Sequence, residues 1–400
     1  MFTQSLAPRP VKALFAVIAG LTLVVGSSPA ATARGTDARR SVGTTTAHGH
    51  PYSLENRGLR AAHGGTSAAP AAPRAGRRDN GNRTVLVWSQ RSADGSGIHL
   101  MIAHGDGGEA RALTAPVDGV YDLDPQISPD NRTVLFERDT DDAIQVVTIG
   151  IDGHGEHVVP LGCQDPCIGD VTPTWGPDGA SVWFTRVLGP FDDDDTAASA
   201  VLWTADLGGA NVHQVSPEGV AGTYEEYSAK FLPNGDRVFL RLRNADLTNI
   251  LVRVGRDGRE HALTDWAISA DIFDPSPART GPTAGLVVFE TYGHGAPEGI
   301  AQAVATVPSG CATPAACMAR VKYLTPTLLD PDAPAENYNP VWSPDGTHVA
   351  YVHAYDGTDA DPGYGADIWA MTWKGTHKTQ LSDAPEWDFR PDWAYLPRHS

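Results

Sequence analysis

Residues 337–352 read N-Y-N-P-V-W-S-P-D-G-T-H-V-A-Y-V, and this stretch decides the fold of the chain. A short strand ends in Pro344-Asp345-Gly346. Proline presets φ for a turn there, and glycine accepts the left-handed backbone that a tight turn requires. The apolar residues 349–352 then predict a second strand running back beside the first. The stretch is therefore a β-hairpin.

The same unit recurs along the chain. Residues 122–131 read D-L-D-P-Q-I-S-P-D-N and residues 170–179 read D-V-T-P-T-W-G-P-D-G, with weaker copies at 226–235 and 271–277. A third strand follows each hairpin, and a short fourth strand comes after a turn such as Asp257-Gly258. Four antiparallel strands that repeat every 45 to 65 residues or so predict the blades of a β-propeller.

The two ends of the repeat region give the number of blades. Residues 84–114 supply the second, third and fourth strands of a blade but no first strand, whereas residues 388–395 form a lone first strand, D-F-R-P-D-W-A-Y. We expect this last strand to join the first blade, which closes the ring and removes an open sheet edge. The sequence thus predicts an all-β, six-bladed propeller over residues 84–396.

These repeats resemble the TolB-like propeller family, whose blades carry a WD40-like S-P-D-G repeat such as residues 343–346. The resemblance covers residues 84–396 and implies a partner, often a peptide or protein segment, bound at the mouth of the central channel. TolB itself has an α/β domain ahead of its propeller. Residues 34–83 have no hydrophobic period that predicts such a domain.

The first 83 residues predict export rather than a folded domain. Arg9 and Lys12 precede the apolar residues 13–25, and residues 31–33 read A-T-A, so 1–33 is predicted to be a secretory signal peptide. An uncleaved anchor is the alternative. Residues 34–83, rich in Ala, Gly, Pro and Arg, are predicted to be a disordered tether. We expect a secreted or cell-envelope protein.

The charge of the body limits its partners. Residues 80–400 hold 20 basic and 45 acidic side chains, a net charge of −25. Such a body repels nucleic acid and anionic membranes. We therefore expect an extracytoplasmic protein, peptide or glycan as the partner, no membrane span in the mature chain, and a monomer.

Four cysteines fall in two close pairs, Cys163/Cys167 and Cys311/Cys317. An exported chain meets an oxidising compartment, so two local disulfides are predicted. A zinc site is the alternative, but neither pair has the C-x-x-C spacing and no histidine follows at ligand distance.

No nucleophile elbow, H-E-x-x-H, phosphate-binding loop or EF-hand pattern occurs. His157, His213 and His261 occupy similar places in separate units, which separates them around the rim, and only His294 and His353 are predicted in loops that matter. The acidic runs 192–195 and 356–365 offer calcium ligands, although a solvated loop explains them as well. No cofactor, metal site or catalytic residue is predicted.

Polar residues open all six first strands, which line the channel of a propeller. They are Asp122, Asp170, Glu226, Asp271, Asn337 and Asp388. One interpretation is an acidic collar at the channel mouth that binds a basic peptide end, a sugar or a cation. The other is a repeat-encoded cap, in which each carboxylate accepts backbone or side-chain hydrogen bonds inside the protein.

Three functions follow. The first is a non-enzymatic binding or scaffold propeller that engages its ligand at the channel mouth. The second is a secreted propeller enzyme, of the polysaccharide lyase or lactonase type, with a metal in the channel. The third is a purely structural surface protein.

Overall fold

The computed structural model describes residues 84–191, 197–217, 223–292, 303–325, 335–355 and 365–396. The predicted signal peptide, the predicted tether, the acidic run 192–195, His294 and most of the acidic loop 356–365 lie outside these residues. Within the described part of the chain, no helix is both long and apolar enough to cross a membrane.

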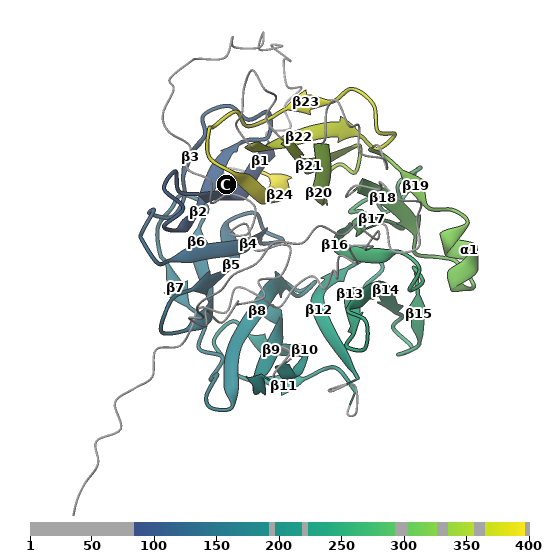
Figure 1. The fold of residues 1–400 in the computed structure, drawn as a ribbon, viewed down its shortest axis with the longest axis horizontal. Coiled ribbons are helices and arrows are strands. Elements are labelled where there is room, and N and C mark those ends of the chain that lie inside the picture. The colour runs from purple at the N-terminus through teal and green to yellow at the C-terminus, as the bar shows by residue number, and fades with distance from the viewer. Residues whose placement is uncertain are drawn as a thin grey trace, which may run out of the picture.

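Six four-stranded antiparallel sheets surround a central channel, each running from an inner strand to an outer one (Figure 1). The inner, first strands are β4 (Tyr121–Ile127), β8 (Cys167–Trp175), β12 (Tyr224–Phe231), β16 (Ser269–Pro275), β20 (Ala335–Trp342) and β24 (Asp388–Tyr395). The second strands are β1 (Thr84–Arg91), β5 (Thr133–Asp139), β9 (Ser181–Phe191), β13 (Arg237–Arg243), β17 (Leu286–Tyr292) and β21 (His348–Tyr355).

The third and fourth strands continue each sheet outward. The third strands are β2 (Ile98–His104), β6 (Ile144–Gly150), β10 (Ala197–Asp206), β14 (Thr248–Val254), β18 (Ala303–Pro308) and β22 (Gly365–Thr372). The fourth are β3 (Arg111–Ala112), β7 (His157–Val158), β11 (His213–Gln214), β15 (Glu260–Ala262), β19 (Lys322–Tyr323) and β23 (Thr379–Gln380). Blade 1 is β24 with β1–β3, and blades 2 to 6 follow in chain order.

Ring closure is confirmed. The C-terminal strand β24 pairs antiparallel with β1, with Val85 opposite Ala394 and Leu86 opposite Trp393. The strand from one end of the propeller thus completes the sheet at the other end, and blade 1 has no open inner edge.

The turn after each inner strand explains why the repeat keeps its S-P-D-G letters. Ser343 Oγ and Thr347 N both donate to Asp345 Oδ1, at 2.6 and 2.9 Å, and His348 N donates to Ser343 Oγ at 2.9 Å. Gly346 has φ of +68°, and a Cβ there would lie 3.1 Å from the Cβ of Ala278. Glycine is therefore required by backbone conformation and by the close approach of the loop between β16 and β17 of blade 5.

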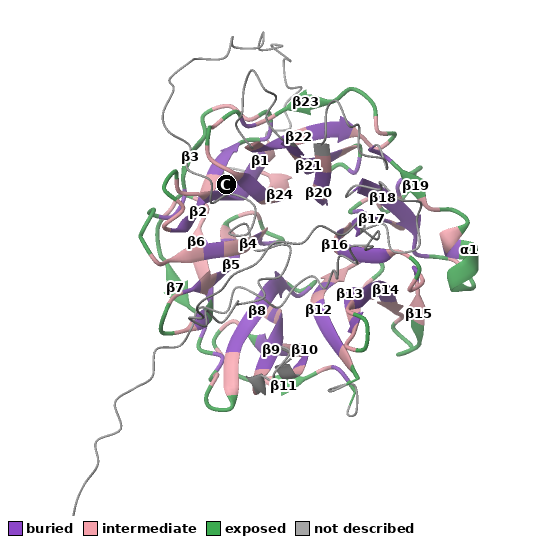
Figure 2. Cartoon of the chain, viewed as in Figure 1, coloured by how far each residue is buried: buried purple, intermediate pink, exposed green. Residues whose placement is uncertain are grey.

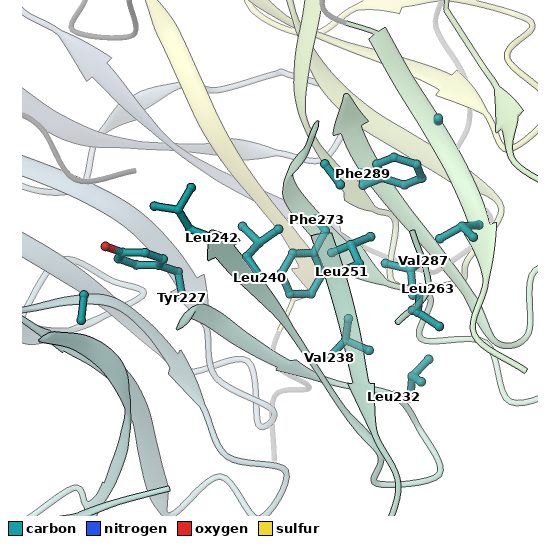
Figure 3. Close-up of a cluster of buried hydrophobic side chains, with 14 of the residues drawn as sticks. Tyr227, Leu232, Val238, Leu240, Leu242, Leu251, Leu263, Phe273, Val287 and Phe289 are labelled. Carbon is teal, nitrogen blue, oxygen red and sulfur yellow. The ribbon is translucent and has the colours of Figure 1, made fainter. Parts of the chain in front are cut away.

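The apolar core lies between neighbouring blades, so the inner parts of the ribbon are buried and the outer strands exposed (Figure 2). One cluster joins blades 4 and 5, where Tyr227 and Leu240 pack with Phe273, Val287 and Phe289 (Figure 3). Since each blade has two apolar faces, every blade needs both neighbours to bury them.

Two details differ from the expectations. His353 was predicted in a loop, which is wrong: it lies inside β21, because the second strand extends past the apolar run to Tyr355. A five-residue helix, α1 (Pro314–Met318), also interrupts the all-β chain between β18 and β19. Thr313 caps it, accepting a 3.2 Å bond from Ala316 N, and Pro314 fits its first turn.

Candidate functional site

The channel is lined by all six inner strands. In five of them a residue with positive φ sits at a β-bulge, and its position two residues after the strand's opening polar residue repeats from blade to blade. These residues are Asp124, Thr172, Ser228, Asn339 and Arg390, with φ between 47° and 56°. All five line the central cavity, together with Ile272 and Phe273 of the sixth inner strand, β16. The bulge turns a polar side chain into the channel at the same depth in each of these five blades.

An ion pair occupies the middle of the channel. Arg390 Nη1 binds Asp124 Oδ2, and Arg390 N donates to Asn339 Oδ1 at 3.0 Å. Burial works against the charge of Arg390, but Asp124, Glu137 and Asp271 outweigh it and raise its pKa. Arg390 is therefore a fixed cation that faces carboxylates from both blade 2 and blade 5.

A second charged group lies where the inner strands end. Lys230 Nζ is 3.3 Å from Asp274 Oδ1, and Asp274 Oδ2 accepts a 2.9 Å bond from Trp342 N. Asp392 Oδ2 accepts a 2.6 Å bond from Ile127 N. Burial raises the pKa of Asp392 to about 6, against the lowering effect of Lys230. Charged groups thus lie at two levels of the channel, and they are held by neighbouring blades.

Polar bonds join every pair of adjacent inner strands, which makes the channel wall a closed ring. The bonds are Ile127 N to Asp392 Oδ2 (2.6 Å), Trp175 Nε1 to Gln126 O (2.9 Å), Ser228 N to Thr172 Oγ1 (3.3 Å), Lys230 Nζ to Asp274 Oδ1 (3.3 Å), Trp342 Nε1 to Asp274 O (3.1 Å) and Arg390 N to Asn339 Oδ1 (3.0 Å). The lining residues are therefore positioned by neighbouring blades as well as by their own strands.

Three of the six predicted mouth residues are carboxylates paired with arginine from the second strand of their own blade. Asp122 accepts from Arg138 at 2.6 and 2.9 Å, and Asp170 from Arg186 at 2.7 and 2.9 Å. Glu226 Oε1 accepts from Arg241 at 3.0 and 2.5 Å. All three carboxylates are buried. These are strong charge-assisted contacts made inside each blade.

The other three, at Asp271, Asn337 and Asp388, have no arginine opposite. Asp388 Oδ1 accepts from Trp88 Nε1 and Gln90 Nε2, at 2.7 and 2.8 Å. Asn337 Oδ1 lies 2.9 Å from Nδ1 of His353. Asp271 accepts a 2.9 Å bond from Ile272 N. All six side chains therefore have the internal partners expected of caps, and contact with a ligand stays a prediction.

The sequence analysis missed a set of buried carboxylates beside the channel. Glu290 is the cross-strand neighbour of Asp271, and its Oε2 accepts a 2.6 Å bond from Asn339 N. Burial and the Glu290 charge together raise the pKa of Asp271 to about 8. Glu290 follows a buried phenylalanine at the end of the apolar run V-V-F, and a charged residue directly after such a run was the available sequence signal.

Glu137 and Asp139 form the equivalent group in blade 2. Glu137 Oε2 accepts a 2.7 Å bond from Thr172 N, the bulge residue of the next blade. Burial raises the pKa of Asp139 to about 7, and Asp124 adds to the effect. Blades 2 and 5 face each other across the ring, so the uncompensated acids lie on opposite sides of Arg390.

The histidines do not converge. His157, His213 and His261 lie in the outermost strands β7, β11 and β15 of different blades. Over the described ranges, the three potential metal ligands that come together are Cys163, Cys167 and Asp170. The two sulfurs of that group are bonded to each other, and Asp170 is engaged by Arg186.

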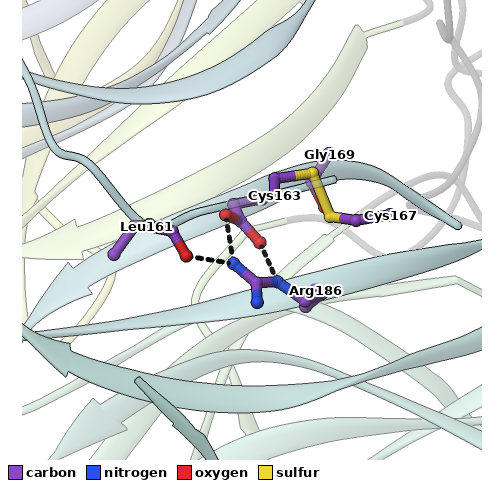
Figure 4. Close-up of a disulfide and its surroundings, with 6 residues drawn as sticks. Leu161, Cys163, Cys167, Gly169 and Arg186 are labelled. Carbon is purple, nitrogen blue, oxygen red and sulfur yellow. Dashed lines mark hydrogen bonds and ion pairs between the residues drawn. A yellow bond between two sulfur atoms is a disulfide. The ribbon is translucent and has the colours of Figure 1, made fainter. Parts of the chain in front are cut away.

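Both predicted disulfides are confirmed: Cys163–Cys167 and Cys311–Cys317, each with Cα atoms 5.3 Å apart. The first braces the chain that enters β8 (Figure 4). Arg186 Nη2 donates to Leu161 O at 2.9 Å as well as to Asp170, so the arginine holds both the strand and the segment before the disulfide.

Comparison with known proteins agrees with this architecture. Neither a protein-family model nor a curated protein sequence matches the chain. Among solved structures, TolB from Acinetobacter baumannii matches with a TM-score of 0.56 and 18% identity, over 78% of this chain and 66% of that one. The fold is that of a TolB-like β-propeller.

Two further solved structures match this chain. The Kuenenia stuttgartiensis hydrazine synthase matches with a TM-score of 0.54 and 12% identity, over 79% of this chain and 47% of that one. A chain of a nidogen/laminin complex matches with a TM-score of 0.50 and 12% identity, over 78% of this chain and 98% of that one. This chain spans just under two thirds of the TolB chain and about half of the hydrazine synthase chain. Identities this low show a common fold only.

Proposed function

We propose that this protein is an exported, non-enzymatic binding propeller that engages an extracytoplasmic protein, peptide or glycan at the mouth of its channel. The observation that carries the proposal is the polar cavity lined by all six inner strands, with side chains turned inward at repeated bulges. A concave site whose polar groups are already fixed loses little freedom when a ligand binds.

Charge favours a ligand that presents cationic or hydrogen-bond-donating groups. Residues 80–400 carry a formal net charge of −25. Low-dielectric channel walls concentrate the field of this acidic body at the mouth. The match to a chain of a nidogen/laminin complex, which joins two proteins, is consistent with a protein partner for this fold.

The test is site-specific photocrosslinking with the full-length exported protein. A photoreactive amino acid is placed at Gln126 or Thr174, which line the cavity, and the protein is incubated with the cell-envelope fraction. The matched control carries it at Val158, which is 41% exposed on the outer strand β7. We expect a discrete crosslinked product from the channel positions and none from the control.

Two results would overturn the proposal. Crosslinking that is equal at Val158 and at the channel positions means that no ligand prefers the channel. A stoichiometric metal ion in the purified protein, together with turnover of an acidic polysaccharide or a lactone, means that the protein is an enzyme.

A further inference from the structure

The outer strands of blades 5 and 6 carry a charge opposite to that of the rest of the body. Residues 303–325 contain no acidic residue, and residues 365–380 contain only Asp367. Asp367 is 3% exposed, and its Oδ2 accepts a 2.9 Å bond from Gln380. The same two segments hold Arg320, Lys322, Lys374 and Lys378. Three of the four lysines beyond residue 83 are therefore found here.

All four basic side chains are exposed, and two of them meet at one aromatic ring. Lys322 Nζ of β19 and Lys374 Nζ of the β22–β23 turn each lie 5.3 Å from the ring centroid of Trp373. The ring joins the two blades: Trp373 packs with Leu324 of blade 5. Lys322 and Lys374 thus form one patch across the junction of blades 5 and 6, and Arg320 and Lys378 flank them in the sequence.

The backbone on both sides of this patch is held in place. Gly375 has φ of +81°, and a Cβ there would lie 2.5 Å from Leu324 O, so the two blades touch at the turn itself. On blade 5, the Cys311–Cys317 disulfide encloses α1, and Arg320 N donates to Cys317 O at 2.8 Å. The disulfide therefore fixes the segment from which Arg320 and Lys322 project.

Carboxylates do not neutralise these cations in the part of the chain that the structure covers: the ion pairs found there involve neither Lys322 nor Lys374 nor Arg320. The centre of the patch is Lys322 and Lys374, which meet at the Trp373 ring. At physiological ionic strength the Debye length is about 8 Å, so the acidic body is screened and the local cations dominate at contact.

We propose that Arg320, Lys322, Trp373, Lys374 and Lys378 form a second binding surface, the rim patch, for an acidic polysaccharide. The ammonium groups bind sugar carboxylates as point charges. The half-buried Trp373 ring between them adds an apolar surface that a sugar ring can contact. The rim patch lies on exposed outer strands that end two neighbouring blades, a ridge along which a linear polymer can lie. It is separate from the channel and does not depend on the proposed channel ligand.

The probe is alginate, a linear uronate polymer, with neutral dextran as the uncharged control and polyphosphate as the sugar-free polyanion. Binding to the full-length protein is measured by affinity electrophoresis at about 150 mM salt. We expect binding to alginate and not to dextran. The double variant K322E/K374E should weaken alginate binding about tenfold or more, because two attractions become repulsions. K322R/K374R should retain it.

The matched control is R111E. Arg111 occupies in β3 the place that Lys322 occupies in β19: it is exposed and pairs with the third strand of its own blade. We expect R111E to bind alginate like the wild type. Melting temperatures of all variants should be unchanged, because the altered side chains are exposed.

Three outcomes would overturn the proposal: no retardation of the wild type by alginate, an equal loss of binding in R111E, or binding of polyphosphate without binding of alginate. The first result means that the protein has no site for alginate. The second means that the loss of binding follows net charge rather than the rim patch. The third means that the patch binds polyanions without recognising a sugar. None of them bears on channel crosslinking at Gln126 and Thr174.

Discussion

Neutralising Asp170 should destabilise the propeller more than neutralising either of two comparable acids. Asp170 is 2% exposed and receives two bonds from Arg186, at 2.7 and 2.9 Å. The Arg186 side chain is itself 9% exposed, and its other acceptor among the described residues is Leu161 O. Asp170→Asn leaves a buried guanidinium without a counter-charge, which costs about 3 kcal/mol or more of unfolding free energy.

Two other variants, D122N and D388N, give smaller expected losses of unfolding free energy for comparison. Arg138 keeps its 2.6 Å ion pair with Glu156 when Asp122 becomes Asn, so D122N should cost less, about 2 kcal/mol. Among the described residues, the donors to Asp388 are the neutral groups of Trp88, Gln90 and Ser382, and an asparagine oxygen still accepts from Trp88 and Gln90. D388N should therefore cost about 1 kcal/mol or less.

The assay is urea denaturation at pH 7, followed by the fluorescence of buried tryptophans such as Trp88 and Trp342. Midpoint and slope are compared among the three variants, since an unchanged slope assigns the difference to stability. The reasoning is refuted if the unfolding free energy of D170N lies within about 0.5 kcal/mol of the wild-type value, or if D388N lowers the unfolding free energy most among the three variants. Affinity for the channel ligand is measured on the same variants. If D122N and D170N bind it as the wild type does, Asp122 and Asp170 act only as internal caps and not as ligand-binding residues.

Three more predictions follow from the same structure. Deleting residues 386–400 removes β24, exposes the edge of β1 and should cause aggregation; a soluble truncation with unchanged melting would contradict ring closure. Stability should fall as pH rises from 5 to 8: burial raises the pKa values of Asp139 and Asp271 to about 7 and 8, so the folded state holds protons that the unfolded state loses near pH 4. Each such proton contributes about 1.4 kcal/mol per pH unit below its folded-state pKa, so the two together should make unfolding at pH 8 easier than at pH 5 by several kcal/mol, and D271N should flatten the profile. A stability that rises over this range would exclude protonated carboxyls. The exported protein should begin at or near Arg34, and an intact mass that includes Met1 would contradict signal-peptide cleavage.

The sequence alone determined the propeller, its six blades and its closure. Each of these depends on local chemistry that repeats: a Pro-Asp-Gly turn has one preferred conformation wherever it occurs, and the blade follows from it. The lone strand at 388–395 predicted closure because an unpaired first strand and a blade lacking one must meet. The disulfides followed in the same way, since cysteines four and six residues apart have few other partners.

Only the tertiary structure decided what the polar residues do. Asp122, Asp170 and Asp388 stand at the same place in the repeat, yet the first two meet arginine and the third meets Trp88 and Gln90. The partner comes from the second strand, where the residue opposite is arginine in blades 2 and 3 but Gln90 in blade 1. The same holds for the rim patch, where Lys322 and Lys374 are 52 positions apart and meet only because neighbouring blades pack side by side. Packing between blades, which no single repeat encodes, sets these contacts.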